Sequence, residues 1–219
     1  MDTEGGGVSH CLNYIFEGGT QMTDSKIYER TSGGISEVNL SSKLLADRLI
    51  FLTGEINHDS ANDVLQKILY LRRQDAKKPI AVIVNSYGGL VEAGLMIYDI
   101  IRGSKTPIYT VCCGCAYSMA AVIAAAGHKR YILPNSKLMC HEPLVSAGVG
   151  GSSSTMKSIS DGLIETKRKM DRILAELTGR EEKEIAEATS YDHYFTAEEA
   201  VDFGLCDKII TIDEMLEIA

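Results

Sequence analysis

The sequence lacks any block of lysine or arginine. Its 22 basic residues are outnumbered by 30 acidic ones, which gives a formal net charge of −8. A protein that binds nucleic acid or an anionic membrane surface normally carries a concentrated basic patch. Neither nucleic acid nor a membrane is therefore expected as a partner. The most apolar stretch, residues 109–127, contains a serine, a central glycine and three cysteines, so we interpret it as buried core and not as a membrane span.

The signs of export and of a disulfide framework are absent as well. The chain opens with an acidic, glycine-rich segment, where a secretory signal has positive charge followed by an apolar run. The cysteine spacings suggest no disulfide framework, and no second pair stands at zinc-finger spacing. We therefore expect a cytoplasmic protein with free thiols and no bound metal. The six cysteines are Cys11, Cys112, Cys113, Cys115, Cys140 and Cys206.

The chain has no internal repeat, and 219 residues with 45% apolar content suit one core. Residues 1–25 are rich in glycine, serine and threonine and show little periodicity. We expect them to form a flexible N-terminal arm or a removable propeptide. Residues 26–219 are expected to form a single domain.

Short apolar runs alternate with stretches of helical periodicity along most of the chain. This alternation predicts an α/β fold of stacked βαβ units with parallel strands. A helix over residues 154–177 is unusually long, ends before Gly179, and has an apolar side suited to packing against another subunit. Strands are predicted at residues 48–54, 80–84, 108–112, 130–132, 137–140 and 208–212. Other helices are predicted to start near Ser60, Leu90, Ser118 and Thr196.

Ser118 stands where a buried strand gives way to a helix. The free N–H groups of a helix N-terminus can stabilise an oxyanion beside a serine hydroxyl, which suits a nucleophile. A serine at this position is also a common N-cap, and Ser118 alone is better explained in that way. Gly88 and Gly89 follow another buried strand and can present an N–H to a bound carbonyl, although a tight turn explains them equally well. A phosphate-binding loop is excluded because no Gly-Lys-Ser or Gly-Lys-Thr follows.

Two further residues have the chemistry of a catalytic base and its partner. His141 follows an apolar strand, and its near-neutral pKa suits general-base catalysis, although a structural role is more common for such a histidine. Asp192 stands among aromatic residues, where a buried carboxylate needs a partner such as an imidazole N–H; a turn or N-cap aspartate is the alternative. Spacing alone does not join Ser118, His141 and Asp192, because a catalytic triad is defined in space.

The segments around these residues resemble the proteolytic subunit of the Clp protease family, with a match over residues 27–212. The Gly-x-Ala-x-Ser-Met segment of that family corresponds to residues 114–119. Its Leu-Pro-Asn-Ser-x-x-Met-x-His-x-Pro-Leu segment corresponds to residues 133–144. Its Ala-x-Glu-Ala-x-x-x-Gly-Leu-x-Asp tail corresponds to residues 197–207, and residues 85–89 resemble its oxyanion loop. Three motifs in the correct order are far more specific than one.

The resemblance implies a serine endopeptidase with Ser118 as nucleophile, His141 as base and Asp192 as the group that orients the base. The oxyanion donors carried over are the backbone N–H groups of Gly89 and Met119. The resemblance also implies the ClpP/crotonase-like fold with a protruding handle helix. It implies two stacked seven-subunit rings and an AAA+ unfoldase that feeds in unfolded proteins. The unfoldase uses the ATP, so no cofactor is expected for this chain.

Several residues depart from the family's pattern. Tyr87 replaces a proline, Tyr117 a small residue, Cys115 and Glu142 glutamines, and His193 a common arginine at the ring interface. These departures leave open whether the rings contain one type of subunit or a second Clp subunit as well. They also keep a weakly active or silent scaffold subunit as an alternative. An acyl-CoA hydratase or isomerase of the related crotonase fold is a further alternative, but it does not need the three residues together.

Overall fold

The computed structural model describes residues 25–31, 34–145, 148 and 150–218. The arm or propeptide predicted for residues 1–25 lies almost wholly outside this range. The chain divides into two compact units, residues 1–42 and 43–219. In the first unit, strands β1 (Lys26–Thr31) and β2 (Gly34–Asn39) form an antiparallel hairpin that the sequence analysis did not predict. Helix α1 (Leu40–Ala46) follows the hairpin.

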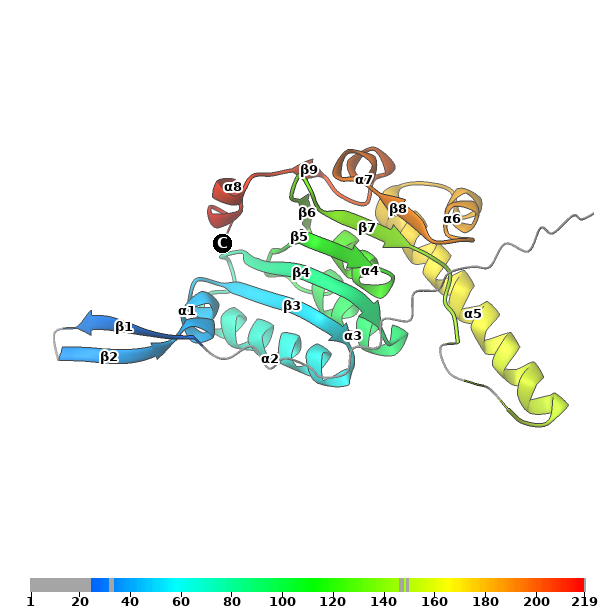
Figure 1. Ribbon diagram of the computed structural model, residues 1–219, viewed down its shortest axis with the longest axis horizontal. Coiled ribbons are helices and arrows are strands. Elements are labelled where there is room, and N and C mark those ends of the chain that lie inside the picture. Colours follow the sequence, from blue (N-terminus) through cyan, green and yellow to red (C-terminus); the bar gives the residue numbers. More distant parts are fainter. Residues whose placement is uncertain (1–24, 32–33, 146–147, 149, 219) are drawn as a thin grey trace, which may run out of the picture. The chain divides into compact units, whose positions relative to one another are not determined.

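A seven-stranded sheet forms the centre of the second unit (Figure 1). Its main path runs β3-β4-β5-β6-β9, with β7 paired to β5 and β8 paired to β7. All pairs are parallel, as predicted, except β7–β8. The strands are β3 (Leu49–Ile56), β4 (Ile80–Gly89), β5 (Ile108–Tyr117), β6 (Lys129–Ile132), β7 (Lys137–Cys140), β8 (His193–Phe195) and β9 (Lys208–Ile209).

Strand β5 divides its pairing between two partners. Its first half, Tyr109 to Cys112, pairs with β6, and its second half, Cys115 to Tyr117, pairs with β7. Gly114 lies between the halves with a φ of 95°, a conformation that favours glycine. The fork therefore brings the ends of β5 and β7 side by side, and Ser118 and His141 directly follow those two ends.

Helices cover both faces of the sheet. Buried residues of α2, α3 and α4 form the larger core cluster, together with the C-terminal part of α5. Met215 of α8 packs with Leu49, Ile83 and Val111 in a second cluster on the opposite face. The helices are α2 (His58–Gln74), α3 (Val91–Arg102), α4 (Met119–Ala125), α5 (Ser153–Thr178), α6 (Glu182–Ala188), α7 (Ala197–Phe203) and α8 (Ile212–Leu216).

The long helix α5 matches the predicted handle closely. Ser152 caps its start, and Gly179 ends it in the left-handed conformation with a φ of 73°. Its buried residues begin only at Met170, and the N-terminal half runs clear of the sheet in Figure 1. None of the helices in the described part of the chain is long and apolar enough to cross a membrane.

Four predicted boundaries were wrong by two residues or more in ways that the structure explains. Helix α2 begins at His58, because Asn57 is its N-cap and Ser60 is the third helical residue of the capping box. Strands β4 and β5 continue past residues 84 and 112, because a shift in their register lets the pairing resume between Ser86 and Ala116. The strand predicted at residues 208–212 stops at Ile209, since Thr211 caps α8.

Arg48 fixes the entry to β3. The residue is buried, at 6% exposure, and its side chain donates hydrogen bonds to four backbone carbonyls. Its own φ of 64° lies in the left-handed region, so the surrounding contacts must hold this conformation. The acceptors are the carbonyl oxygens of Leu71 at 3.2 Å, Asp75 at 3.0 Å, Lys78 at 2.9 Å and Pro79 at 2.7 Å. Arg48 thus joins the end of α2 and the start of β4 to β3.

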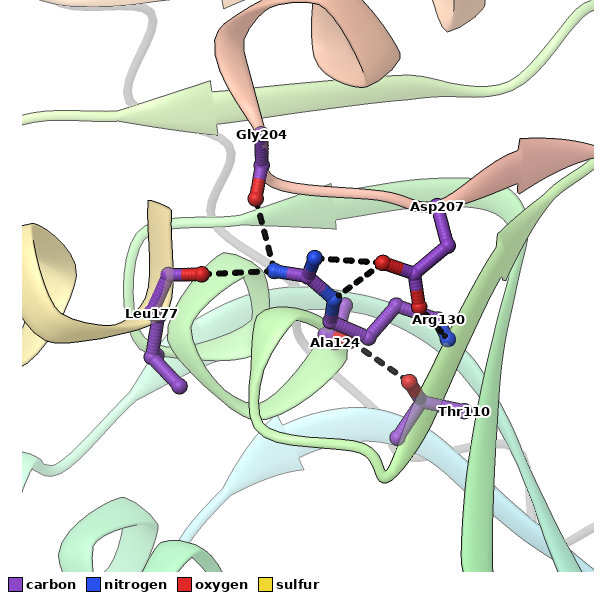
Figure 2. A network of polar contacts seen from close by, with 6 residues as sticks. All are labelled: Thr110, Ala124, Arg130, Leu177, Gly204 and Asp207. Atoms are coloured by element: carbon purple, nitrogen blue, oxygen red, sulfur yellow. Dashed lines mark hydrogen bonds and ion pairs between the residues drawn. The ribbon is translucent and has the colours of Figure 1, made fainter. Parts of the chain in front are cut away.

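Arg130 of β6 also joins separate segments through hydrogen bonds to backbone carbonyls. Figure 2 shows Arg130 between the carbonyl of Leu177, at 2.8 Å, and that of Gly204, at 2.6 Å, with its guanidinium also paired to Asp207. The same view shows Thr110 donating to the Ala124 carbonyl at 2.6 Å. Arg130 therefore joins the end of α5 and the turn after α7 to the sheet.

Replacing Thr106 with valine is expected to stabilise the protein. Thr106 Oγ1 is buried and, within the described residues, has no hydrogen-bond partner. Valine keeps the branched shape and removes the unsatisfied hydroxyl, so the free energy of unfolding should rise by about 1 kcal/mol in urea denaturation. Thr110→Val is the matched comparison, because it removes a satisfied buried hydroxyl and should lower stability by about 1 kcal/mol. Equal changes in the free energy of unfolding for the two substitutions would contradict the conclusion that the Thr106 hydroxyl is unsatisfied.

Candidate active site

The sheet topology brings Ser118, His141 and Asp192 to one edge. Ser118 follows β5 and His141 follows β7, and these strands are parallel neighbours. Strand β8 runs antiparallel to β7, with His193 opposite Cys140. Asp192, which directly precedes β8, therefore lies beside the end of β7. Residues that are 74 positions apart in the sequence (118 to 192) meet for this reason.

The side chains of the three residues form a chain of contacts. His141 Nε2 lies 2.7 Å from Ser118 Oγ, a hydrogen-bond distance. On the other side of the ring, His141 Nδ1 lies 3.7 Å from Asp192 Oδ1, which is an ion-pair distance but too long for a hydrogen bond. The imidazole is 15% exposed and the carboxylate 58% exposed. The prediction that Asp192 is buried among aromatic residues was wrong, because β8 is a three-residue strand at the edge of the sheet.

The structure does not support an ordinary cap role for Ser118. It occupies the N-cap position of α4, but its side chain makes no capping hydrogen bond. Its φ of 54° and ψ of −124° place it outside the usual regions for a residue with a Cβ. Its own N–H donates to the Met139 carbonyl at 2.7 Å. The backbone thus forms a sharp turn that directs the hydroxyl at His141, and strained backbone of this kind clusters at functional sites.

Gly88 and Gly89 are packed closely against the residues around them. Their φ values are 97° and 153°. A Cβ on Gly88 would lie 2.7 Å from the Tyr117 carbonyl oxygen and 2.9 Å from Ser118 Cβ. A Cβ on Gly89 would lie 2.2 Å from the Ile56 carbonyl oxygen. Only glycine fits at these positions, and the segment lies directly against the serine turn and the start of α4.

The carboxylate of Glu142, beside the histidine, has a cationic partner. Glu142 Oε2 lies 3.5 Å from Lys167 Nζ, and Lys167 also pairs with Asp171 at 3.2 Å. The Glu142 N–H donates to the Thr189 carbonyl at 2.8 Å. These contacts connect the segment after β7 to α5. Sequence reasoning did not identify Lys167 or Asp171, because both belong to a long helix whose polar residues carry no local motif.

A small pocket opens beside the serine. It is narrow and partly open to solvent. Most of its wall is apolar and comes from α3, α4, α5 and the segment after β7. The residues that line it are Val91, Ser118, Met119, Val122, Cys140, His141, Pro143, Met170 and Leu174. A pocket of this kind can receive an apolar side chain next to a reacting carbonyl.

The thiols near the site are not reactive groups. Burial raises the pKa of the Cys140 and Cys206 thiols to about 12, and it raises the pKa of Cys112 further. They therefore stay protonated near neutral pH and behave as small apolar side chains. Within the described ranges, no group of three or more histidine, cysteine, aspartate or glutamate residues is arranged to hold a metal ion.

Comparison with known proteins shows which family the chain belongs to. A sequence model of the Clp protease family matches residues 32–213. The chain belongs to the Clp protease family. It is 39% identical over 186 residues to a protein of Ligilactobacillus salivarius (strain UCC118) named "ATP-dependent Clp protease proteolytic subunit". That alignment covers 84% of this chain and 93% of the relative.

Membership of the Clp protease family confirms two predictions made from the sequence. The chain is a protease, and its parallel sheet with flanking helices is the fold expected from the resemblance. The roles of individual residues, including the two oxyanion donors Gly89 and Met119, stay predictions. Those predicted roles depend on the contacts among Ser118, His141 and Asp192 described above.

Proposed function

We propose that this Clp-family chain is a serine endopeptidase and the proteolytic subunit of an ATP-dependent Clp protease. The observation that carries the proposal is the 2.7 Å contact between His141 Nε2 and Ser118 Oγ, with the Asp192 carboxylate on the other side of the imidazole. A serine with a histidine in hydrogen-bond reach and a carboxylate behind it is the arrangement of an activated nucleophile. The same contact counts against a silent scaffold subunit.

In the proposed mechanism, Ser118 Oγ attacks the scissile carbonyl while His141 Nε2 accepts its proton. The resulting imidazolium is stabilised by Asp192, which also keeps the remaining proton on Nδ1. The oxyanion of the tetrahedral intermediate accepts hydrogen bonds from the N–H groups of Gly89 and Met119. Met119 is the first residue of α4, so its N–H has no acceptor within that helix. His141 then donates its proton to the leaving amine, and water hydrolyses the acyl-enzyme.

The separation of 3.7 Å between His141 Nδ1 and Asp192 Oδ1 is an ion-pair distance that a small movement of Asp192 would turn into a hydrogen bond. Catalytic hydrogen bonds are often long in free enzymes and shorten when substrate binds. Asp192 is free to approach because it is mostly exposed and directly precedes a short edge strand. In the proposed cycle, this distance shortens as positive charge develops on the imidazole.

We propose further that the chain acts in the cytoplasm without a cofactor or a metal of its own. The relative's name describes an ATP-dependent protease, and the phosphate-binding loop signature is missing from this sequence. ATP is therefore used by a separate AAA+ unfoldase that supplies unfolded proteins. Two stacked seven-subunit rings, of this chain alone or together with a second Clp subunit, complete the proposed assembly. The exposed apolar residues Met156 and Ile164 on α5 support a contact between subunits along that helix.

The apolar pocket predicts which peptides are cleaved best. With leucine or methionine immediately before the scissile bond, kcat/KM is expected to exceed that for aspartate by about 10²-fold, because an unpaired carboxylate loses hydration in this pocket. Fluorogenic peptides that differ at that single position provide the measurement. In a control peptide, the aspartate is moved to a position outside the pocket, where the loss should be small. A similar rate for all residues at the first position would contradict the pocket's role.

A fluorophosphonate probe tests the proposed chemistry directly. Such a probe phosphonylates an activated serine, and mass spectrometry of the digested protein locates the adduct. We expect one adduct on Ser118 that is lost in His141→Ala and retained in His58→Ala, since His58 is exposed at the start of α2. A protein that hydrolyses peptides without labelling at Ser118 would refute the proposed nucleophile.

A further inference from the structure

Three tyrosines lie beside the three parts of the proposed active site. Tyr87 precedes Gly88 and Gly89, Tyr117 precedes Ser118, and Tyr194 is the second residue after Asp192. The Tyr117 ring contacts the other two edge-on. Its centroid lies 5.5 Å from that of Tyr87 at an interplanar angle of 65°, and 5.5 Å from that of Tyr194 at 90°. Both geometries are favourable for aromatic pairs.

The strand register places the tyrosines on one face of the sheet. Tyr117 is opposite Met139, and Met139 is opposite Tyr194, so the row crosses β5, β7 and β8. The neighbours Ala116, Leu138 and Phe195 point into the large core beneath the helices. Because side chains alternate along a strand, the tyrosine row lies on the opposite face. It is therefore separate from the hydrogen bonds that join the triad residues.

Phe195 anchors the edge strand β8 on the core face of the sheet, while Asp192 itself has few side-chain contacts. In the part of the chain that the structure describes, the only side-chain partner recorded for Asp192 is His141, at 3.7 Å. Backbone contacts hold the preceding segment through Thr189, and the His193 ring stacks on Phe195 with its Nδ1 3.2 Å from the Ala188 carbonyl. On the tyrosine face, Tyr194 contacts the body of the sheet through Tyr117, although it is itself 52% exposed.

We propose that Tyr117 is a positioning residue that holds Asp192 behind His141. Its ring contacts Tyr87 of β4 on one side and Tyr194 of β8 on the other. It therefore connects β4 and β5 to the edge strand β8, which Asp192 directly precedes. The role rests on the proposed serine-protease function. The ring itself supplies the contact, and the hydroxyl has no part in it.

The test measures peptide hydrolysis by Tyr117→Ala, Tyr117→Phe and the control Tyr70→Ala. Tyr70 is a tyrosine outside the row that is as exposed as Tyr194, at 52%, and it lies on α2. Tyr117→Ala is expected to lower kcat by about 10- to 100-fold and to change KM by less than about two-fold, because misplacement of a catalytic group by about 1 Å has effects of that size. Tyr117→Phe keeps the ring and should retain activity, as should Tyr70→Ala.

A double-variant cycle separates positioning of Asp192 from a general structural effect. If Tyr117 acts through Asp192, adding Tyr117→Ala to Asp192→Asn should cause little further loss in kcat. The same fold-loss in both backgrounds would overturn the proposal, and so would full activity of Tyr117→Ala. If Tyr117→Ala does not fold, Tyr194→Leu provides the same comparison at an exposed position. Labelling of wild-type Ser118 by the fluorophosphonate probe tells the two proposals apart, since without that labelling the serine-protease function itself fails.

Discussion

Replacing Ser118 with alanine is expected to lower kcat for peptide hydrolysis by about 10⁵- to 10⁶-fold, the scale of loss when a triad nucleophile is removed. Alanine retains the Cβ, so it strains the turn at φ 54° no more than serine does. The main loss is the hydroxyl that His141 activates across 2.7 Å. Residual hydrolysis should come only from substrate binding and the oxyanion donors.

The measurement compares kcat for a fluorogenic peptide between wild type and variant after equal purification. Ser158→Ala is the matched control, because Ser158 is exposed on α5 and is not among the residues that line the pocket. The control should keep wild-type kcat. Retention of more than about one per cent of the activity in Ser118→Ala would exclude Ser118 as the nucleophile, since a lost nucleophile costs several orders of magnitude.

Replacing Arg48 with methionine is expected to lower the free energy of unfolding by about 3 to 5 kcal/mol. Methionine fills a similar length but cannot donate, so four carbonyls lose the guanidinium that now satisfies them. A lysine at this position should recover only part of the loss, because an ammonium cannot reproduce the planar fork of donors. The peptidase rate of the folded fraction should change little, since Arg48 is not among the residues that form the proposed site.

Urea denaturation at one protein concentration, followed by circular dichroism, measures this loss. The concentration is held constant because assembly changes apparent stability. Arg73→Met is the control, since Arg73 is exposed in the last turn of α2 and should cost less than about 1 kcal/mol. A similar small cost for Arg48→Met would show that the four hydrogen bonds contribute little to the folded state.

The sequence predicted most of the central fold because the buried strands are short and rich in β-branched residues. The runs at residues 80–84 and 108–112 correspond to the first halves of β4 and β5, and the helix predicted at 154–177 corresponds to α5. Helix caps at Asn57 and Thr211 decided two of the wrong boundaries, and the ends of β4 and β5 were placed too early in segments that contain glycines with positive φ. A glycine with positive φ can end a strand or form a bulge within it, and the local sequence does not distinguish the two.

The elements that escaped prediction depend on distant partners. The three-residue strand β8 exists because it pairs with β7, more than 50 positions earlier in the chain. The β1–β2 hairpin has no strong alternation of apolar and polar residues, so its pairing carried little local signal. Strand pairing at such separations depends on the tertiary structure, so the β-strand propensities of the local residues do not predict it.

The proposed site was located by motifs in the correct order, and local patterns alone did not locate it. Taken alone, the local sequence explained Ser118 better as a helix cap, and the ordered motifs made it the predicted nucleophile. Its strained turn and its contact with His141 are consistent with that role. The exposure of Asp192 could not be predicted, because it depends on the position of β8 at the sheet edge. The row of tyrosines also escaped notice, since Tyr87, Tyr117 and Tyr194 meet only through the strand register.

The antiparallel return of β8 also determines when a newly made chain gains the complete triad. Synthesis produces Ser118 and His141 well before Asp192, and β8 can pair with β7 only after α5 and α6 have been made. Folding generally follows the order of synthesis, from the N-terminus onward. A chain still attached to the ribosome therefore carries a serine and a base without the acid. In the proposed serine protease, the order of the strands would therefore delay proteolytic competence until synthesis is nearly finished.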